Sequence, residues 1–386
     1  MPTPALRADR LMMARALDLA KKARFICPPN PAVGCVLVSA AGDIIGTGHT
    51  QRAGEAHAEI VALRDAAAHG HETKGATAYV TLEPCAHHGR TAPCCEALAA
   101  AGVRRVLASS MDPNPLVAGR GFAHLRAAGV QVDMADEESL RASRALNIGF
   151  FRRMERGVPW VRMKTAASLD GRTALPGGAS QWITGEAARL DVHNWRARAC
   201  AVLTGSGTVL ADDPLLNARI EGLPRQPLLV ICDSQLRTPL TAQLWSVAGR
   251  RVLIAHAVRD EAREAALCEK GAELLHLPAA GDSTGENVDL PALLRVLAAR
   301  ECNEIHLEAG ARLSGAFLAA DLVDELLLYQ APVLLGEGRP IAALGPLDSL
   351  AQGTRLRWRQ RKDVGDDVRL RAIVCGHEDE PAAAQQ

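Results

Sequence analysis

One histidine and two cysteines at fixed spacings constrain this chain more than any other feature. His57 comes first, and Cys85 follows Pro84 with eight residues between it and Cys94. Imidazole and thiolate are ligands that zinc prefers, and a structural zinc is closed by four protein ligands. Three ligands leave the fourth tetrahedral position to a water, whose pKa the metal lowers to about 7. The pattern therefore predicts a catalytic zinc site.

A carboxylate stands beside the first of these residues. Glu59 lies two residues after His57, in the segment 58–63 that reads as the start of a helix, so both side chains can project into one pocket. In zinc-dependent base deaminases with H-x-E and P-C motifs, such a carboxylate takes a proton from the water and delivers it to the leaving amine. We expect Glu59 to have this catalytic role in a hydrolytic loss of ammonia from an aromatic amidine carbon.

The composition restricts the class of protein. The 386 residues suit two domains of about 150 to 230 residues. Lys and Arg number 44, Asp and Glu also number 44, and only 3% of the residues are aromatic. A nucleic-acid-binding surface would need a basic face and stacking aromatics, so we expect a small-molecule substrate and no nucleic-acid partner.

The cysteines and the lengths of the apolar runs indicate the cellular compartment of the protein. The chain has ten cysteines and no signal-like start, and at least two of the thiols are wanted as metal ligands, so we expect a cytoplasmic protein. No apolar run approaches the roughly 20 residues that span a bilayer, and we expect no membrane partner.

Apolar runs alternate with helical patterns through both halves of the chain. This order predicts two α/β domains, the first a three-layer domain with the zinc at strand-to-helix turns. A charged helix over 137–153 precedes a strand that begins at Trp160, so we place the domains at 1–150 and 151–376, with 377–386 as a disordered tail. The expected strands lie at 34–38, 78–82, 105–108, 201–203, 228–231, 252–254, 304–307 and 325–328.

The second half lacks the usual dinucleotide fingerprint. Gly205-Ser206-Gly207 is followed by Thr208 without a third glycine at the required spacing, which disfavours a standard dinucleotide fold. The turn either brings backbone amides close to a phosphate or is a plain tight turn, and spacing alone leaves both interpretations open.

Longer motifs resemble one known family. Residues 29–34 (PNPAVG) and 81–91 (TLEPCAHHGRT) resemble the pyrimidine deaminase half of the bifunctional riboflavin-pathway deaminase/reductase, although Ala86 replaces a more usual Ser. Residues 164–172 (KTAASLDGR), 180–184 (SQWIT) and 208–214 (TVLADDP) resemble its reductase half. The resemblance covers about residues 9 to 375 and implies a cytidine-deaminase-like α/β/α domain followed by a dihydrofolate-reductase-like α/β domain.

The resemblance implies two successive reactions. The first is the zinc-dependent hydrolytic deamination of 2,5-diamino-6-(5-phosphoribosylamino)pyrimidin-4(3H)-one. The second is the NADPH-dependent reduction of the ribosyl side chain of the product, 5-amino-6-(5-phosphoribosylamino)uracil, to ribityl. We also expect a homo-oligomer.

The resemblance also assigns residues. The metal ligands become His57, Cys85 and Cys94, with Cys95 as a competing ligand that we disfavour because a neighbouring side chain on a helix points elsewhere. His87 and His88 would line the substrate cleft. The cofactor contacts fall on Ala166, Trp182, Thr208, Asp212, Ser234, Gly310, Ala311, Arg312, Leu313, Ser314, Gly315 and Ala316. The substrate contacts fall on Ser180, Arg196, Leu216, Arg219 and Glu308.

Two of the substrate residues have a clear chemical role. The guanidinium groups of Arg196 and Arg219 suit the substrate phosphate. Asn217-Ala218, just before Arg219, departs from the more usual Thr-Val. Glu308 follows a predicted strand, at the edge where α/β proteins bind ligands, and it suits a hydrogen bond to ribose or base or a cap for the next helix.

Two other functions are compatible with parts of the pattern. A nucleoside or tRNA base deaminase would carry a non-catalytic C-terminal assembly domain and a basic, aromatic-lined surface. A structural zinc module would close the metal with Cys95 or His88 and would have no need of Glu59.

Overall fold

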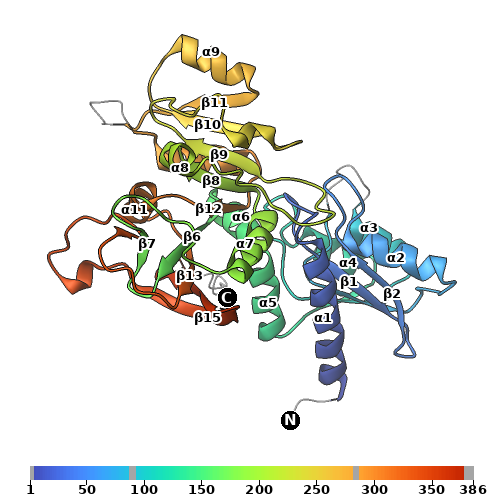
Figure 1. The fold of residues 1–386 in the computed structure, drawn as a ribbon. Helices are drawn as coiled ribbons and strands as arrows, with labels where there is room; N and C mark the ends of the chain where they lie inside the picture. The colour runs from blue at the N-terminus through green and yellow to red at the C-terminus, as the bar shows by residue number, and fades with distance from the viewer. Residues whose placement is uncertain (1–3, 87–92, 281–286, 378–386) are drawn as a thin grey trace. The chain divides into compact units, whose positions relative to one another are not determined.

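The computed structural model describes residues 4–86, 93–280 and 287–377. It divides into two compact units with the boundary between Gly157 and Val158 (Figure 1). The boundary expected at residue 150 falls inside a helix, Ile148–Arg156, whose Phe150 and Phe151 are buried in the core of the first unit.

The first unit is built around a five-stranded sheet in the order β2-β1-β3-β4-β5. The strand β1 is antiparallel to both neighbours, whereas β3, β4 and β5 are parallel. The strands are β1 (Gly34–Val38), β2 (Ile44–His49), β3 (Thr77–Val80), β4 (Arg105–Ala108) and β5 (Gln131–Met134). The helices are α1 (Pro4–Ala23), α2 (Ala58–Ala68), α3 (Cys94–Ala100), α4 (Arg120–Ala127), α5 (Glu137–Leu146) and α6 (Ile148–Arg156).

Helices cover both faces of this sheet. Along β1, Cys35 and Leu37 pack in a core with residues of α2, α3, α4 and α6, while Val36 and Val38 pack on the other face with Met13 of α1. Successive strand residues point to opposite faces, so a strand buried on both faces reads as one continuous apolar run. The predicted three-layer α/β/α arrangement is confirmed.

The helix expected over 137–153 is two helices. They meet at Asn147, whose side-chain amide donates to the main-chain oxygen of Ala32 at 3.0 Å and accepts from its N–H at 2.7 Å. The same amide also donates to the main-chain oxygen of Ser143 at 3.4 Å, and a local side-chain bond of this kind competes with helix continuation. The break therefore fastens the segment around Ala32 to the end of α5.

The second unit contains a nine-stranded sheet in the order β11-β10-β9-β8-β12-β6-β13-β16-β15. The strands from β11 to β13 are parallel, and β16 and β15 add an antiparallel hairpin at one edge. Its strands are β6 (Trp160–Ser168), β8 (Ala201–Gly205), β9 (Leu228–Cys232), β10 (Val252–His256), β11 (Ala272–His276), β12 (Glu304–Leu307), β13 (Glu325–Ala331), β15 (Leu356–Val364) and β16 (Asp367–Val374), and β7 (Arg172–Ala174) pairs with β14 (Arg339–Pro340). The helices are α7 (Glu186–Arg198), α8 (Ser206–Asp212), α9 (Glu261–Glu269), α10 (Leu290–Ala299) and α11 (Ala311–Ala319), with 3-10 turns at Gln243–Ser246 and Leu350–Gln352.

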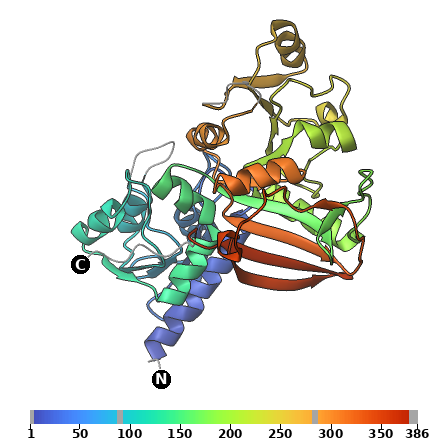
Figure 2. The same cartoon turned by 90° about the vertical axis from the view of Figure 1, so that its left-hand side faces the viewer.

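The helices of the second unit also lie on both faces of its sheet. Leu203 of β8 packs with residues of α10 and α11 in one core, and Val202 packs with residues of α8 and α9 in another. Against the strand β13, α7 places Val192 and Trp195 on Leu327 and Tyr329. This unit confirms the predicted second α/β domain, although the hairpin of β15 and β16, seen beside β13 in Figure 2, was not anticipated.

A layer of paired charges, the buried ion-pair layer, lies between α7 and the sheet. It consists of Arg162, Arg198, Glu304 and Glu325 around the ring of Trp195. Arg162 is fully buried and donates to Glu304 at 2.8 Å and to Glu325 at 2.9 Å. Arg198 donates to Glu304 at 2.8 Å, and the Arg162 guanidinium carbon lies 4.7 Å from the Trp195 ring centre. Each buried charge therefore has an opposite charge beside it.

The last described residue of the chain is packed within the second unit. His377, the first residue of the expected tail, is buried, and its Nδ1 lies 2.8 Å from Asp324 Oδ1. The rest of the tail, 378–386, lies outside the described residues. Within the described ranges, no helix combines the length and the apolar character needed to span a bilayer.

Candidate functional sites

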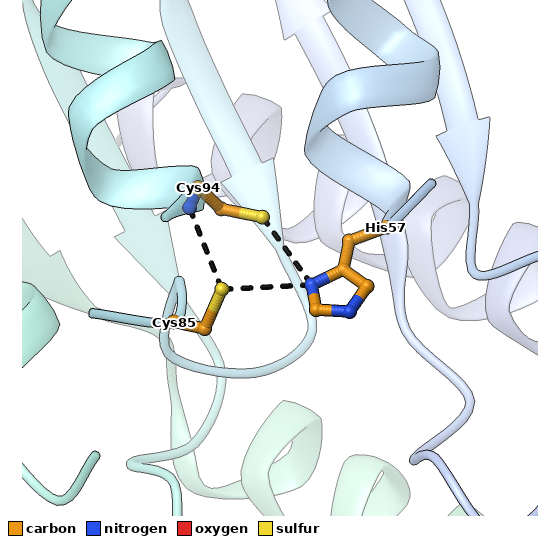
Figure 3. Close-up of side chains that lie close together, drawn as sticks. All are labelled: His57, Cys85 and Cys94. Carbon is orange, nitrogen blue, oxygen red and sulfur yellow. Dashed lines mark hydrogen bonds between the residues drawn. The ribbon is translucent and has the colours of Figure 1, made fainter. Parts of the chain in front are cut away.

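Three ligand atoms converge in the first unit. His57 immediately precedes α2, Cys85 lies in the loop after β3, and Cys94 is the first residue of α3. His57 Nδ1 lies 3.5 Å from Cys85 Sγ and 3.4 Å from Cys94 Sγ, and the three ligand atoms all lie within 4.8 Å of one another (Figure 3). The fold thus brings together the three residues that the sequence spacing selects.

The chemistry of this donor set fits zinc. The Cys94 thiol donates a hydrogen bond to Cys85, which lowers the pKa of Cys85 against the opposing effect of burial, and His57 lowers that pKa further. The same contact raises the pKa of Cys94. The main-chain N–H of Cys94 also donates to Cys85 Sγ at 3.4 Å. One thiolate is therefore stabilised by the protein itself, and the thiolate is the form that binds a metal.

Glu59 adds a titratable carboxyl to this cluster. It is the second residue of α2, and its side chain is buried. Burial raises the pKa of the carboxyl to about 7, the charge of Cys85 adds to that effect, and His57 opposes it. A carboxyl with a pKa near neutrality can both accept and return a proton, which is the property that a proton carrier needs.

Cys95 is packed in the apolar core of the first unit, in the cluster of buried residues that also contains Leu98 and Ala62. Burial raises the pKa of its thiol to about 11. Cys95 does not belong to the group of potential ligands found in the described part of the chain. His87 and His88 lie outside the described residues.

Glu83 is a residue near the metal cluster to which the motifs assigned no role. Its carboxylate accepts three main-chain hydrogen bonds, from Asp112 at 3.2 Å, Gly119 at 3.0 Å and Phe122 at 3.2 Å. These bonds fasten the loop between β4 and α4, together with the first turn of α4, to the residue two positions before Cys85. The sequence shows a Glu after a buried strand. It does not show that this Glu accepts three hydrogen bonds from main-chain groups about 30 to 40 residues further along the chain.

In the second unit, charged side chains gather around Glu308, the residue after β12. Arg196 of α7 donates from Nε to Oε1 at 2.5 Å and from Nη2 to Oε2 at 2.9 Å. Lys164 Nζ of β6 lies 3.7 Å from Oε2, and His306 Nε2 lies 3.2 Å from Oε1. Burial opposes ionisation of Glu308, but the charges of Arg196 and Lys164 outweigh it and hold the pKa of Glu308 well below its ordinary value.

The other residues assigned to the substrate differ from Glu308 and Arg196 in their hydrogen-bond partners and burial. Arg219 donates to Asn217 Oδ1 at 3.1 Å, and Arg196 donates to the main-chain oxygen of Asn217 at the same distance. Leu216 is buried in the core with φ of 50°. Ser180 is half-buried, and no described hydrogen bond links it to this group.

The residues assigned to the cofactor lie mainly where parallel strands end. Thr208 follows β8, Ser234 follows β9, and Gly310 immediately precedes α11. A Cβ on Gly310 would lie 4.0 Å from Thr208 Oγ1, and one on Gly205 would lie 3.3 Å from the Leu313 side chain, so the two turns adjoin. The start of α11 offers unpaired main-chain N–H groups of the kind that bind phosphate. This edge fits a phosphate-bearing cofactor such as NADPH.

Other residues assigned to the cofactor are not part of these two adjoining turns. Trp182 is 69% exposed with the Arg189 guanidinium 4.6 Å from its ring centre, and Asp212 is exposed at the end of α8. Gly315 is buried, and a Cβ there would lie 2.1 Å from the oxygen of Ala343, so this glycine is needed for close packing of α11.

Lys164, His193 and His306 are site residues that the sequence analysis missed. His306 and Glu308 alternate along β12 with Glu304, so a polar period of two inside a buried strand was an available signal. Lys164 approaches the site from β6 and opens the motif 164–172, but no site role was assigned to Lys164 itself, whereas His193 approaches from α7 and no local pattern marks it.

Comparisons with known proteins agree with this architecture. Residues 6–110 match the cytidine and deoxycytidylate deaminase zinc-binding region, and residues 159–370 match the RibD C-terminal domain. The riboflavin biosynthesis protein RibD of Escherichia coli is 45% identical, with 95% of this chain and 99% of that protein covered. The Haemophilus influenzae protein of the same name is 44% identical, with coverages of 94% and 96%.

Solved structures give the same result. RibD of Acinetobacter baumannii superposes with a TM-score of 0.85 at 42% identity, covering 96% of this chain and 99% of that one. The diaminohydroxyphosphoribosylaminopyrimidine deaminase/5-amino-6-(5-phosphoribosylamino)uracil reductase of Thermotoga maritima gives 0.83 at 28% identity, with coverages of 96% and 100%. The fold expected from the sequence is confirmed in both units, and this chain belongs to the RibD family of riboflavin biosynthesis proteins.

Proposed function

We propose that this chain carries out the two successive reactions of its family on one phosphoribosyl compound. It is a bifunctional deaminase and reductase of riboflavin biosynthesis, and it uses Zn²⁺ and NADPH. The first unit deaminates 2,5-diamino-6-(5-phosphoribosylamino)pyrimidin-4(3H)-one, and the second reduces the ribosyl chain of the resulting uracil to ribityl. The observation that carries the proposal is the buried Glu59 beside three convergent zinc ligands, in a chain that also holds the Arg196–Glu308 pair.

In the deaminase step, each of four side chains has a defined role. His57, Cys85 and Cys94 would hold the zinc, which when bound would supply a water with a lowered pKa. The Glu59 carboxylate accepts a proton from the attacking water and returns it to the departing amine. Its near-neutral pKa suits both halves of that transfer, because neither protonation state is strongly disfavoured.

The reductase step depends on orientation by the chain. NADPH supplies the hydride. The ends of β8, β9 and β12 present Thr208, Ser234 and the start of α11 to the cofactor. Glu308 accepts hydrogen bonds from the ribosyl chain or the base, and Arg196 and Arg219 bind the phosphate.

A homo-oligomer is part of the proposal. Exposed large apolar side chains are concentrated in one stretch of the second unit, residues 333–358. They are Val333, Leu334, Leu344, Leu347, Leu350, Leu356 and Trp358. Apolar exposure of this kind is typical of surfaces that another chain covers, and we infer that a second copy does so. Light scattering of the purified chain, with Leu350→Asp as the variant, tests this inference.

We also infer a cytoplasmic enzyme, since Cys85 and Cys94 must remain reduced thiolates to bind zinc. The alternative of a nucleic-acid base deaminase is not favoured. The chain carries no net charge, and its second unit matches a reductase family.

The decisive experiment follows both reactions in one sample. The diamino-pyrimidine substrate is added to purified, zinc-loaded protein with NADPH, and ammonia release and NADPH oxidation are recorded together. Ammonia release followed by NADPH oxidation supports the proposal. Ammonia release without NADPH oxidation, even after addition of the uracil intermediate, would limit the activity to the first unit.

A further inference from the structure

The segment 213–219, which connects α8 towards β9, is fastened to its surroundings at several points. Gln226 pairs with both main-chain polar groups of Ala218, accepting from its N–H and donating to its oxygen at 2.9 Å each. Arg250 donates to the main-chain oxygen of Leu215. Such a segment is held in one conformation before any ligand binds, which lowers the entropic cost of binding.

This segment brings two guanidinium groups to the same residue. Arg196 of α7 donates to the main-chain oxygen of Asn217, and Arg219 donates to its side-chain oxygen, each at 3.1 Å. Burial and the nearby charge of Arg196 both lower the pKa of Arg219. Glu308 neutralises Arg196, whereas no carboxylate of the described residues forms an ion pair with Arg219. The pair therefore carries excess positive charge, which an anion would neutralise.

His193 lies between these two arginines. It stands one turn before Arg196 on α7 and is buried. Its Nδ1 lies 3.2 Å from the main-chain N of Arg219 and also 3.2 Å from the main-chain oxygen of Asn217. A single ring nitrogen serves one of these partners, as an acceptor for the first or a donor to the second.

The other bonds decide between the two tautomers. The Asn217 oxygen already accepts from Arg196, whereas the N–H of Arg219 needs an acceptor. We therefore assign the ring proton to Nε2, so that Nδ1 accepts from Arg219. Burial, together with the charges of Arg196 and Arg219, lowers the pKa of His193 to about 4, so the ring is neutral at physiological pH.

We propose that His193 is a positioning residue of the reductase site, which fastens the main chain at Arg219 to α7 and so fixes the separation of the two guanidinium groups that receive the substrate phosphate. This inference rests on the proposed function of the second unit. It deepens that function because it assigns phosphate recognition to the junction of α7 with the segment 213–219. His193 acts through Arg219 and does not itself need to contact the substrate.

Three substitutions separate positioning from bulk packing. His193→Asn keeps an acceptor close to the place of Nδ1, His193→Gln moves the acceptor towards the place of Nε2, and His193→Leu removes it. The matched control is His377→Leu, which alters another buried histidine of the second unit, next to the amino end of β13 rather than the carboxyl edge that holds the site. The kcat and the KM for NADPH of each variant report whether the second unit, which holds all of these residues, remains folded.

The measurement is the rate of NADPH oxidation with 5-amino-6-(5-phosphoribosylamino)uracil and with its dephosphorylated form. For His193→Leu and His193→Gln we expect KM for the phosphorylated substrate to rise about tenfold, with KM for NADPH and kcat within about twofold of wild type. The preference for the phosphorylated form should fall by the same factor, and His193→Asn should restore most of it. His377→Leu should keep the wild-type preference.

Two results would overturn the inference. One is an unchanged KM for the phosphorylated substrate in His193→Leu, and the other is a loss in His193→Asn as large as in His193→Leu. A wild-type chain that oxidises no NADPH with either substrate would instead contradict the proposed function itself.

Discussion

Arg196 and Glu308 form a two-point ion pair, in which Nε and Nη2 of the guanidinium each donate to a different carboxylate oxygen. Both side chains are nearly buried, and both were assigned to the same substrate. In a buried pair, removal of one partner leaves the other as an uncompensated charge. The pair therefore fixes the orientation of Arg196 before a phosphate arrives.

Arg196→Ala should weaken the binding of the phosphorylated substrate far more than the binding of NADPH. We expect KM for the uracil intermediate to rise by at least about a hundredfold, which corresponds to loss of a charge-assisted contact of roughly 3 kcal/mol. Arg196→Lys should recover little, because an ammonium lacks the planar fork that meets both oxygens. Steady-state kinetics with each ligand varied in turn tests this, and equal losses for substrate and NADPH would refute the assignment of Arg196 to the phosphate.

Glu59→Gln should abolish ammonia release while zinc stays bound. The amide keeps the size of the carboxyl but cannot carry the proton, whereas the three metal ligands are untouched. Ammonia release and metal content are measured on the same preparation, with the exposed Glu72→Gln as the control. Deaminase turnover near the wild-type rate would exclude the role of Glu59 as proton carrier.

Cys94→Ser and Cys95→Ser should have opposite effects on the metal. We expect Cys94→Ser to lose most of its zinc, whereas Cys95→Ser should keep the zinc and lose about 1–3 kcal/mol of stability from a polar group placed in an apolar core. Metal analysis after dialysis, combined with chemical unfolding, distinguishes the two. Zinc loss in Cys95→Ser alone would reverse the ligand assignment.

The stability of the second unit should fall in acid because of Glu325. Burial opposes ionisation of Glu325, but the charges of Arg162 and Arg371 outweigh it and lower its pKa to about 2, from 4.5. A lowered pKa in the folded state gives stability that is complete above the unfolded-state pKa and is lost as pH falls from about 4.5 to about 2, on the order of 3 kcal/mol in total. Denaturant unfolding at pH 6, 4 and 3 measures this loss. Glu325→Gln should be less stable at pH 6 and should show a smaller decrease towards pH 3, and an identical decrease in both proteins would contradict the prediction.

The sequence was most informative where rare residue types carry the chemistry. Cys85 and Cys94 could be selected because two thiols, one imidazole and one carboxyl at set spacings together indicate a catalytic metal site and seldom occur by chance. The parallel strands were equally accessible, since a strand covered on both faces is a continuous apolar run.

The sequence was least informative where contacts join distant segments. Asn147, at which the expected helix is broken, is bonded to Ala32, which is 115 residues away. His193 reaches the site from α7, and nothing in its neighbours marks it; Lys164 belongs to the motif 164–172, but the motif does not show that its side chain meets Glu308. Arg196 and Glu308 were identified through family resemblance, because a lone charged residue usually lies on the surface, and their pairing across 112 residues is a property of the fold.

The buried ion-pair layer beneath α7 has a consequence for the design of variants. A displacement of the helix by one turn, about 5.4 Å, would part Arg198 from Glu304 and leave unpaired ions among buried residues. Apolar side chains tolerate such sliding, but matched charges do not. Single replacements in this layer should therefore be poorly tolerated, and an engineered second unit would have to exchange Arg162, Arg198, Glu304 and Glu325 as one set.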